Sequence, residues 1–171
     1  LTIASSDAGG GAGIQADLKA MSAFGVYGGS VIVGVTAQNT TGVSATEILP
    51  LAIIEQQYDA VLEDLPVAAA KTGMLATREV VLWAADALGA ASFPVVVDPV
   101  MVATNGDQLL GDDAVEAYQA LIGTATLVTP NADETRALTG IDPTESSART
   151  RAAERYLSWG ADAVLFKGGH V

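Results

Sequence analysis

Residues 5–17 read SSDAGGGAGIQAD and follow the short apolar run Leu1–Ala4. A strand that leads through a glycine-rich turn into a helix is a unit from which layered α/β proteins are built. Four glycines within five positions let the backbone adopt positive φ and come close to a ligand. The amides that open the next helix carry partial positive charge, so this turn suits a small polar or anionic ligand.

Two common nucleotide-binding motifs are excluded by the spacing of this turn. A dinucleotide fingerprint needs a third glycine where Ile14 stands, and an acidic residue about 20 positions further on. No Asp or Glu occurs between Lys19 and Glu47. A P-loop needs a lysine directly after a glycine, and no lysine of this chain follows one.

Apolar runs of strand length alternate with amphipathic helical stretches along the chain. We expect strands near residues 1–4, 30–37, 67–71, 95–98, 126–129 and 163–167. We expect helices near residues 14–24, 51–62, 77–88, 113–122, 133–138 and 145–158. The run Val95–Val97 is apolar on both faces, as in a central parallel strand covered by helices. The sequence therefore predicts an α/β fold with a doubly wound, mostly parallel sheet and helices on both faces.

A single domain over residues 1–171 accounts for the length, and it is long enough for a substantial core. The chain starts inside a strand without Met and stops directly after another strand. We therefore expect this domain to be incomplete at its C-terminal end.

Composition excludes several classes of function. The net charge of −12 argues against nucleic acid and against anionic membranes as partners. Without cysteine there is no disulfide framework and no Cys-ligated zinc, and with one histidine a Ser-His-Asp triad is hard to build. No basic-then-apolar signal segment precedes the fold, so we expect a cytoplasmic enzyme or binding protein.

Ligands of open α/β sheets bind beyond the carboxyl ends of the strands. The strand-to-helix connections expected there are residues 5–13, 38–42, 72–76, 99–107, 129–131 and 168–171, and they hold most of the unusual polar residues. The Gln38 amide offers a donor and an acceptor to the edge of an aminopyrimidine-type ring, or is a polar turn residue. Asp17 in the first helical turn is either functional or simply favourable with the helix dipole.

Three further groups near strand ends have both a structural and a functional interpretation. Lys71 needs a partner, which we expect to be Asp98 on a neighbouring strand or a ligand, with the structural ion pair favoured. Asn131 with Glu134 three positions later resembles a capping box, although the same pair could order a hydrated Mg²⁺ beside phosphates. Lys167, which precedes a glycine turn, fits contact with a phosphate, whereas His170 is interpreted as a loop residue.

Six stretches in this order resemble the hydroxymethylpyrimidine/phosphomethylpyrimidine kinase family of thiamine biosynthesis, within the ribokinase-like superfamily. They are DAGGGAGIQADLK at 7–19, AQNT at 37–40, KTGML at 71–75, DPVM at 98–101, TPN with Glu134 at 129–134, and KGGH at 167–170. Each stretch alone is weak, but all six in register are specific, and they cover essentially the whole chain.

The resemblance implies ATP-dependent phosphorylation of 4-amino-5-hydroxymethyl-2-methylpyrimidine and then of its monophosphate. It implies that the pyrimidine pocket is lined by Asp17, Gln38, Met74 and Val100, with the backbone of Ser5. It also implies that Lys167 and Asn131 contact ATP and that Glu134 binds Mg²⁺. Such chemistry relies on positioning and charge neutralisation more than on covalent catalysis. Members of the superfamily are often homodimers.

Two departures from the family pattern bear on this assignment. Ser5 stands where the family usually has glycine, so its β-carbon could crowd the ring or bar a special backbone angle. The Gly-x-Gly-Cys or Gly-x-Gly-Asp stretch that holds the anion hole and catalytic base is absent, so we expect the base beyond Val171. Two alternatives therefore stay open: a pyridoxal kinase of the same superfamily, and a non-catalytic pyrimidine-binding sensor.

Overall fold

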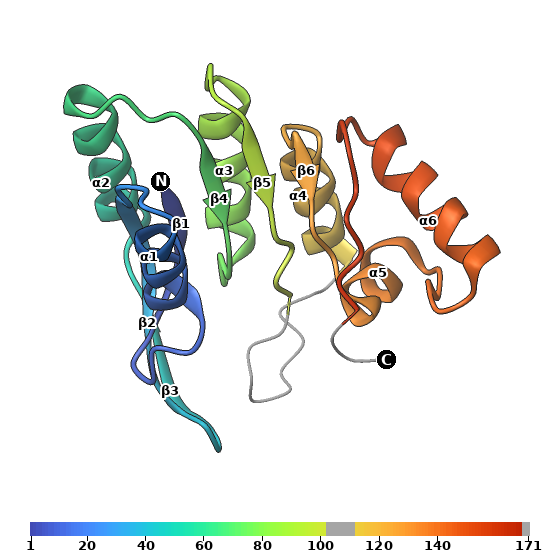
Figure 1. Cartoon of the computed structure of the whole chain (residues 1–171), viewed down its shortest axis with the longest axis horizontal. Coiled ribbons are helices and arrows are strands. Elements are labelled where there is room, and N and C mark those ends of the chain that lie inside the picture. Colours follow the sequence, from blue (N-terminus) through green and yellow to red (C-terminus); the bar gives the residue numbers. More distant parts are fainter. Residues whose placement is uncertain (102–111, 169–171) are drawn as a thin grey trace.

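The computed structural model describes residues 1–101 and 112–168. Its framework is a six-stranded sheet with the order β3-β2-β1-β4-β5-β6 (Figure 1). The strands are β1 (Thr2–Asp7), β2 (Ser30–Asn39), β3 (Gly42–Ile48), β4 (Ala70–Thr72), β5 (Val95–Val97) and β6 (Leu127–Val128). All neighbouring pairs are parallel except β2 with β3.

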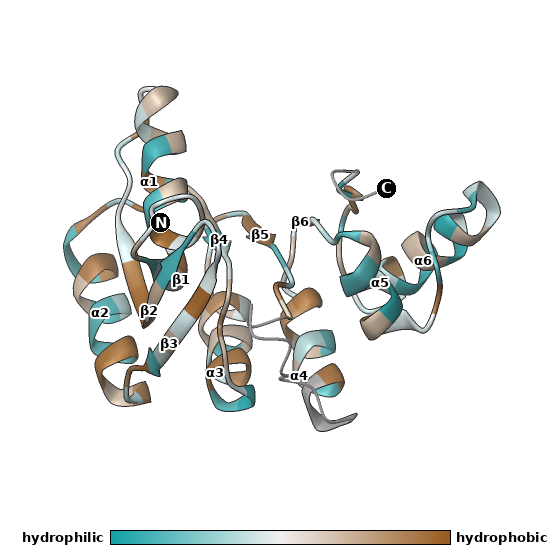
Figure 2. Cartoon of the chain, turned by 90° about the horizontal axis from the view of Figure 1, so that it is seen from below, coloured by the Kyte–Doolittle hydropathy of each residue, from teal (hydrophilic) through white to brown (hydrophobic). Residues whose placement is uncertain are grey.

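Helices cover both faces of this sheet, which confirms the predicted doubly wound architecture. They are α1 (Gly13–Ala23), α2 (Leu51–Asp64), α3 (Arg78–Gly89), α4 (Asp112–Ile122), α5 (Ala132–Thr139) and α6 (Ser146–Ser158). Figure 2 shows α1 on one face and α2, α3 and α4 on the other. None of the helices in the described part of the chain is long and apolar enough to cross a membrane.

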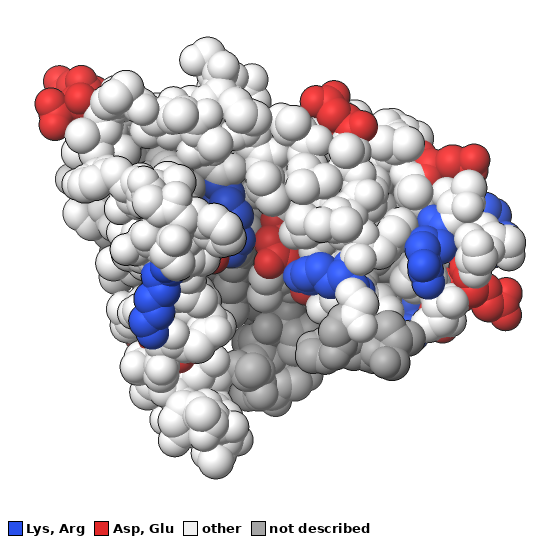
Figure 3. Space-filling view, in the orientation of Figure 1, with Lys and Arg blue, Asp and Glu red and all other residues white. Residues whose placement is uncertain are grey.

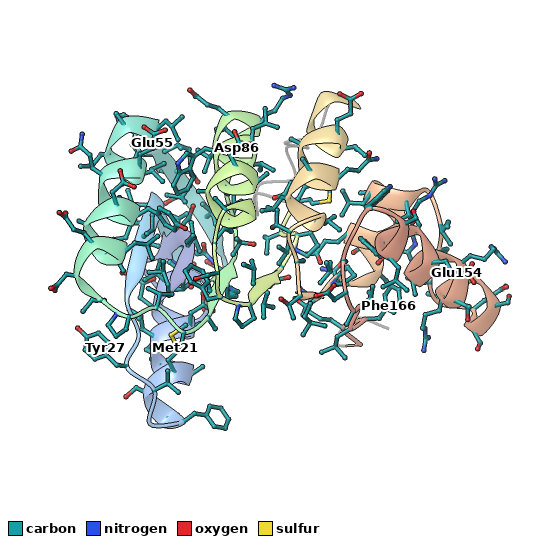
Figure 4. All side chains as sticks on the ribbon, turned by 90° about the horizontal axis from the view of Figure 1, so that it is seen from above. Met21, Tyr27, Glu55, Asp86, Glu154 and Phe166 are labelled. Carbon is teal, nitrogen blue, oxygen red and sulfur yellow. The ribbon has the colours of Figure 1, made fainter. Side chains whose placement is uncertain are left out.

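The expected apolar stripe of α3 accounts for its packing. Its buried side chains are Val80, Val81, Ala84, Ala85 and Leu88. They join one core with the buried valines of the central strands, including Val31, Val33, Val95 and Val97. Charged residues such as Asp86 on α3 and Glu154 on α6 stay exposed on the outer surfaces (Figure 4).

An aromatic cluster anchors α6 to the segment that follows it. The Tyr156 ring is buried, and its centroid lies 5.4 Å from that of Trp159 and 6.4 Å from that of Phe166. Phe166 belongs to residues 163–167, the stretch expected to form a final strand (Figure 4). This segment runs along β6, since Leu165 N–H donates to the Val128 carbonyl at 2.8 Å, although only a single bridge from Val128 to Val164 is regular.

The connection at residues 38–42 was wrongly expected to lead from a strand into a helix. It is the turn of an antiparallel hairpin between β2 and β3. The Asn39 side-chain oxygen accepts from Thr41 N–H at 2.9 Å, and Gly42 follows with a φ of 155°. In Figure 1 this hairpin extends beyond the carboxyl ends of the other strands. Of the remaining expected connections, most of 99–107 and also His170 lie outside the described residues.

Candidate functional site

A hollow of about 310 Å³ opens at the carboxyl ends of β1, β2, β4 and β5, beside the start of α1. Its lining residues are Ser5, Ser6, Asp7, Ala12, Gly13, Ala16, Asp17, Thr36, Gln38, Lys71, Gly73, Met74, Asp98 and Val100. All five residues that we expected around a pyrimidine ring are among them. Figure 3 shows basic and acidic side chains together at the hollow in the middle of this face.

The glycine-rich turn is organised around Asp7, a residue whose role the sequence analysis missed. The Asp7 carboxylate is buried and accepts the N–H groups of Gly9 at 2.8 Å, Gly11 at 3.0 Å and Ala12 at 2.9 Å. Burial alone would raise the pKa of Asp7, but the backbone N–H groups outweigh it and hold the pKa below its usual value. These three amides, which precede the start of α1, therefore bind the chain's own carboxylate and are not available to an external ligand.

Gly13 closes this turn in a conformation that only glycine fits. Its φ is +55°, and a β-carbon there would lie 2.3 Å from the Ser5 carbonyl oxygen. The close approach brings the start of α1 against β1, where the pocket has its floor. Lys19 on α1 braces the same turn by donating to the Gly10 carbonyl at 2.7 Å.

Ser5 ties β1 to the loop after β4. Its backbone N–H and its hydroxyl both donate to the Met74 carbonyl oxygen at 3.1 Å, and the residue is only 3% exposed. Among the described residues only Ala76 combines a side chain with a positive φ. Ser5 thus occupies an ordinary backbone conformation, so its β-carbon bars no special angle at this position.

Asp17 and Lys71 form an ion pair inside the pocket. The Lys71 ammonium lies 2.9 Å and 3.1 Å from the two Asp17 oxygens, and the Thr2 hydroxyl donates to Asp17 Oδ2 at 2.6 Å. The expected partner of Lys71 on the neighbouring strand, Asp98, was wrong. Lys71 aligns with Thr2 and Val96 across the sheet, so its side chain reaches α1 instead.

Gln38 presents its amide to the hollow from the end of β2. The Thr36 hydroxyl lies 3.1 Å from Gln38 Oε1 and 3.0 Å from the Ser6 carbonyl oxygen, so its one hydrogen is shared between them. Within the described chain the Gln38 Nε2 group meets no acceptor. The amide can therefore offer both a donor and an acceptor to one ring edge.

Val100 is held in the pocket wall by a buried tyrosine that the sequence analysis did not single out. Tyr118 on α4 donates its hydroxyl to the Val100 carbonyl at 2.9 Å. Burial and then the charges of Glu134 and Asp98 raise the pKa of Tyr118, so the phenol stays a donor. No pattern marked Tyr118, because it looks like any apolar position of an amphipathic helix.

A second polar cluster adjoins the pocket through Asp98. Lys167 Nζ lies 2.5 Å from Asp98 Oδ1 and 3.5 Å from Glu134 Oε2. Burial and the charge of Asp98 raise the pKa of Glu134, while the Asn131 N–H and Lys167 lower it, and the balance is upward. Because Asp98 also lines the hollow, the hollow and this cluster are contiguous.

Asn131 and Glu134 form the capping box that the sequence indicated. Asn131 N–H donates to Glu134 Oε2 at 2.7 Å, and Glu134 N–H donates to Asn131 Oδ1 at 2.8 Å. The described residues contain no cluster of three or more acidic or histidine side chains placed to hold a metal ion. Asp98 and Glu134 around one ammonium nevertheless suit Mg²⁺, which needs one or two carboxylates and takes further oxygens from phosphates and water.

Comparison with known proteins gives a consistent family. Residues 7–171 match the family model described as phosphomethylpyrimidine kinase. The chain is 52% identical over 173 residues to the hydroxymethylpyrimidine/phosphomethylpyrimidine kinase of Rhizobium meliloti (strain 1021), covering 100% of the chain and 65% of that protein. It therefore spans just under two thirds of this relative's length.

Solved structures agree with that match. The crystal structure of phosphomethylpyrimidine kinase from Clostridium difficile 630 is similar with a TM-score of 0.90 and 45% identity, over 99% of this chain and 77% of that one. The pyridoxal kinase from Staphylococcus aureus in complex with AMP-PCP and pyridoxal is similar with a TM-score of 0.84 and 35% identity, over 98% of this chain and 61% of that one.

Proposed function

This chain belongs to the phosphomethylpyrimidine kinase family, and we propose that the protein phosphorylates 4-amino-5-hydroxymethyl-2-methylpyrimidine and then its monophosphate with ATP, toward thiamine diphosphate. The observation that carries the proposal is the shared hollow, which brings Ser5, Asp17, Gln38, Met74 and Val100 together. Asp98 connects that hollow to Lys167, which pairs with both Asp98 and Glu134. Among the described residues, Lys167 is the only lysine that pairs with a residue of the α5 capping box.

The ring would be held by polar groups at one edge and apolar groups at its faces. Gln38 pairs with the amino group and the adjacent ring nitrogen, since its amide carries a donor and an acceptor side by side. Asp17 accepts a further N–H from the ring substituent. Met74 and Val100 supply the apolar walls, and Ser5 contributes backbone at the floor.

Lys167 and Asn131 would meet the phosphates of ATP, with Glu134 and Asp98 available to hold Mg²⁺ among phosphate oxygens. When bound, the metal supplies charge neutralisation to the triphosphate. A protein with a net charge of −12 needs such local positive charge to accept a triphosphate. The Gly-x-Gly-Cys or Gly-x-Gly-Asp stretch expected to carry the base does not occur in residues 1–171, so no residue described here is assigned that role.

Pyridoxal kinase is the second candidate, because the Staphylococcus aureus pyridoxal kinase is similar over 98% of the chain. Purified full-length protein with ATP and Mg²⁺ should phosphorylate the hydroxymethylpyrimidine with a higher kcat/KM than pyridoxal. Equal or reversed ratios would defeat the pyrimidine assignment. Binding of the pyrimidine without turnover would instead support the sensor alternative.

The contribution of Gln38 can be separated from folding by calorimetry. Gln38→Ala should weaken pyrimidine binding about tenfold, the cost of losing a hydrogen-bonding partner in the pocket. ATP binding should stay unchanged, and Gln56→Ala on the exposed surface of α2 should leave both affinities unaltered. Equal loss of both affinities in Gln38→Ala would assign it a folding role. Cytoplasmic location and homodimer assembly stay predictions of the sequence.

A further inference from the structure

Three side chains from three elements meet at one side of the pocket, where Asp17 and Lys71 line the hollow and the fully buried Thr2 lies behind them. Asp17 comes from α1, Lys71 from β4 and Thr2 from β1. Lys71 contacts both Asp17 oxygens, at 2.9 Å and 3.1 Å, and the Thr2 hydroxyl contacts Oδ2 at 2.6 Å. The side chains of Lys71 and Asp17 are 26% and 17% exposed, so the pair is largely shielded from water.

The sheet register builds this arrangement. Thr2 and Lys71 are direct partners in the parallel β1–β4 pair, so their side chains point to the same face, where α1 packs. Gly73 leaves room for the ammonium, because a β-carbon there would lie 3.1 Å from Lys71 Nζ and 2.9 Å from the Ala4 β-carbon. The contact between Lys71 and Asp17 is thus fixed by the backbone geometry of the sheet, unlike an ion pair between flexible surface side chains.

The three contacts orient the carboxylate and leave part of it available. A carboxylate has about four acceptor sites, and three are engaged here, two on Oδ2 and one on Oδ1. The remaining site lies on Oδ1, in a residue that lines the hollow. With its plane fixed from two sides, Asp17 can aim that site at a ligand N–H without reorganisation.

We propose that Lys71 is a positioning residue that fixes the Asp17 carboxylate for an N–H donor of the substrate ring. This inference rests on the proposed function, because it names what holds the group that would bind the aminopyrimidine. Lys71 also balances the charge of Asp17, so that this end of the pocket suits a neutral heteroaromatic ring. Without the ammonium, only Thr2 would hold the carboxylate, which could then turn away from the ring.

A double-mutant cycle measured by calorimetry tests this role. 4-Amino-5-hydroxymethyl-2-methylpyrimidine is titrated into full-length wild type, Lys71→Met, Asp17→Asn and the double variant. Lys71→Met should raise the Kd about tenfold in the wild-type background, but no more than about twofold in the Asp17→Asn background. Lys71→Arg, which keeps the charge, should recover most of the affinity, and the Kd for ATP should not change in any variant.

A matched control and a second neutral variant of Lys71 separate a specific effect on binding from a general effect of charge or folding. Arg155→Met removes one positive charge on the exposed surface of α6 and should leave the pyrimidine Kd unchanged. If Lys71→Met does not fold by circular dichroism, Lys71→Gln takes its place in the cycle, because it removes the charge and keeps a donor.

The results separate the two proposals. Wild type that fails to bind the pyrimidine would overturn the proposed function and this inference with it. Wild type that binds, with Lys71 variants of unchanged affinity, would overturn this inference alone. Independent, fully additive effects of the two substitutions would also overturn it, because Lys71 would then act by a route that does not pass through Asp17.

Discussion

Gly13 and Gly25 share a positive φ but have different surroundings, so alanine at each position measures a different cost. At Gly25, with a φ of +71° and nothing within 4 Å of an added β-carbon, alanine should cost about 1 kcal/mol of backbone strain. At Gly13 the β-carbon would also lie 2.3 Å from the Ser5 carbonyl, so alanine should cost about 3 kcal/mol or more. Urea unfolding of both variants measures this difference, and equal losses would contradict it.

Asp7 should make the stability of the protein depend on pH. Its folded pKa lies below the usual 3.8, because backbone N–H groups stabilise the carboxylate. Its contribution is therefore fully present above pH 3.8 and is lost as the pH falls through the folded pKa. We expect the deficit of Asp7→Asn in unfolding free energy to be largest at neutral pH and to shrink below pH 3.8.

Glu134→Gln should change stability with pH in the opposite direction to Asp7→Asn. Burial raises the folded pKa of Glu134 above 4.5, so ionisation costs the folded state free energy as the pH rises. The stability of Glu134→Gln relative to wild type should therefore increase from about pH 4 to neutral pH. A relative stability that falls over this range would contradict the assigned direction.

At this scale the sequence predicted which residues gather at the pocket but not how they are held. Strand-end positions and family motifs pointed to Gln38, Met74 and Val100, since parallel strands end at one edge of the sheet. The partner of Lys71 was wrong because it depends on the register between β1 and β4, which no sequence pattern specifies. Asp7 was overlooked because the glycines beside it suggested a turn that binds a small polar or anionic ligand.

Helix α3 offers an element-scale test of capping. The Thr77 hydroxyl oxygen accepts from Val80 N–H at 3.3 Å at the helix start. Thr77→Ala should cost about 1 kcal/mol, because this N–H loses its side-chain acceptor. Thr77→Ser keeps the hydroxyl and should retain most of the stability. Urea unfolding of the two variants, with unchanged m values, measures the loss in unfolding free energy. If Thr77→Ser lost as much stability as Thr77→Ala, the hydroxyl would contribute nothing.

Among the elements, the helices and the buried strands were predictable, and the antiparallel edge strand β3 was not. Buried runs such as Val95–Val97 and the stripe of α3 carry the hydrophobic period of their element. β3 is mostly exposed, and its sequence GVSATEI has no strict alternation of apolar and polar residues. Its pairing with β2 depends on the turn around Asn39 and Gly42, which resembled a loop in the sequence.

For the whole molecule, the excess of acidic residues predicts a response to salt. With 20 acidic against 8 basic side chains, self-repulsion opposes the compact state at neutral pH. Raising NaCl from about 0.01 M to 0.2 M shortens the Debye length from about 30 Å to less than 10 Å and should raise Tm. KCl should give the same curve if the effect is screening. Different curves for the two salts would point to a specific cation site.

The Asp7 turn also bears on how this pocket could be inhibited. Three of its amides are already saturated by a carboxylate from the same chain, so phosphate mimics would have to displace an internal anion there. A fragment screen against the hollow should therefore enrich flat, uncharged heterocycles over acidic compounds. Inhibitors of this site would then be built from an uncharged heterocycle in the hollow, with acidic groups added only where they reach Lys167.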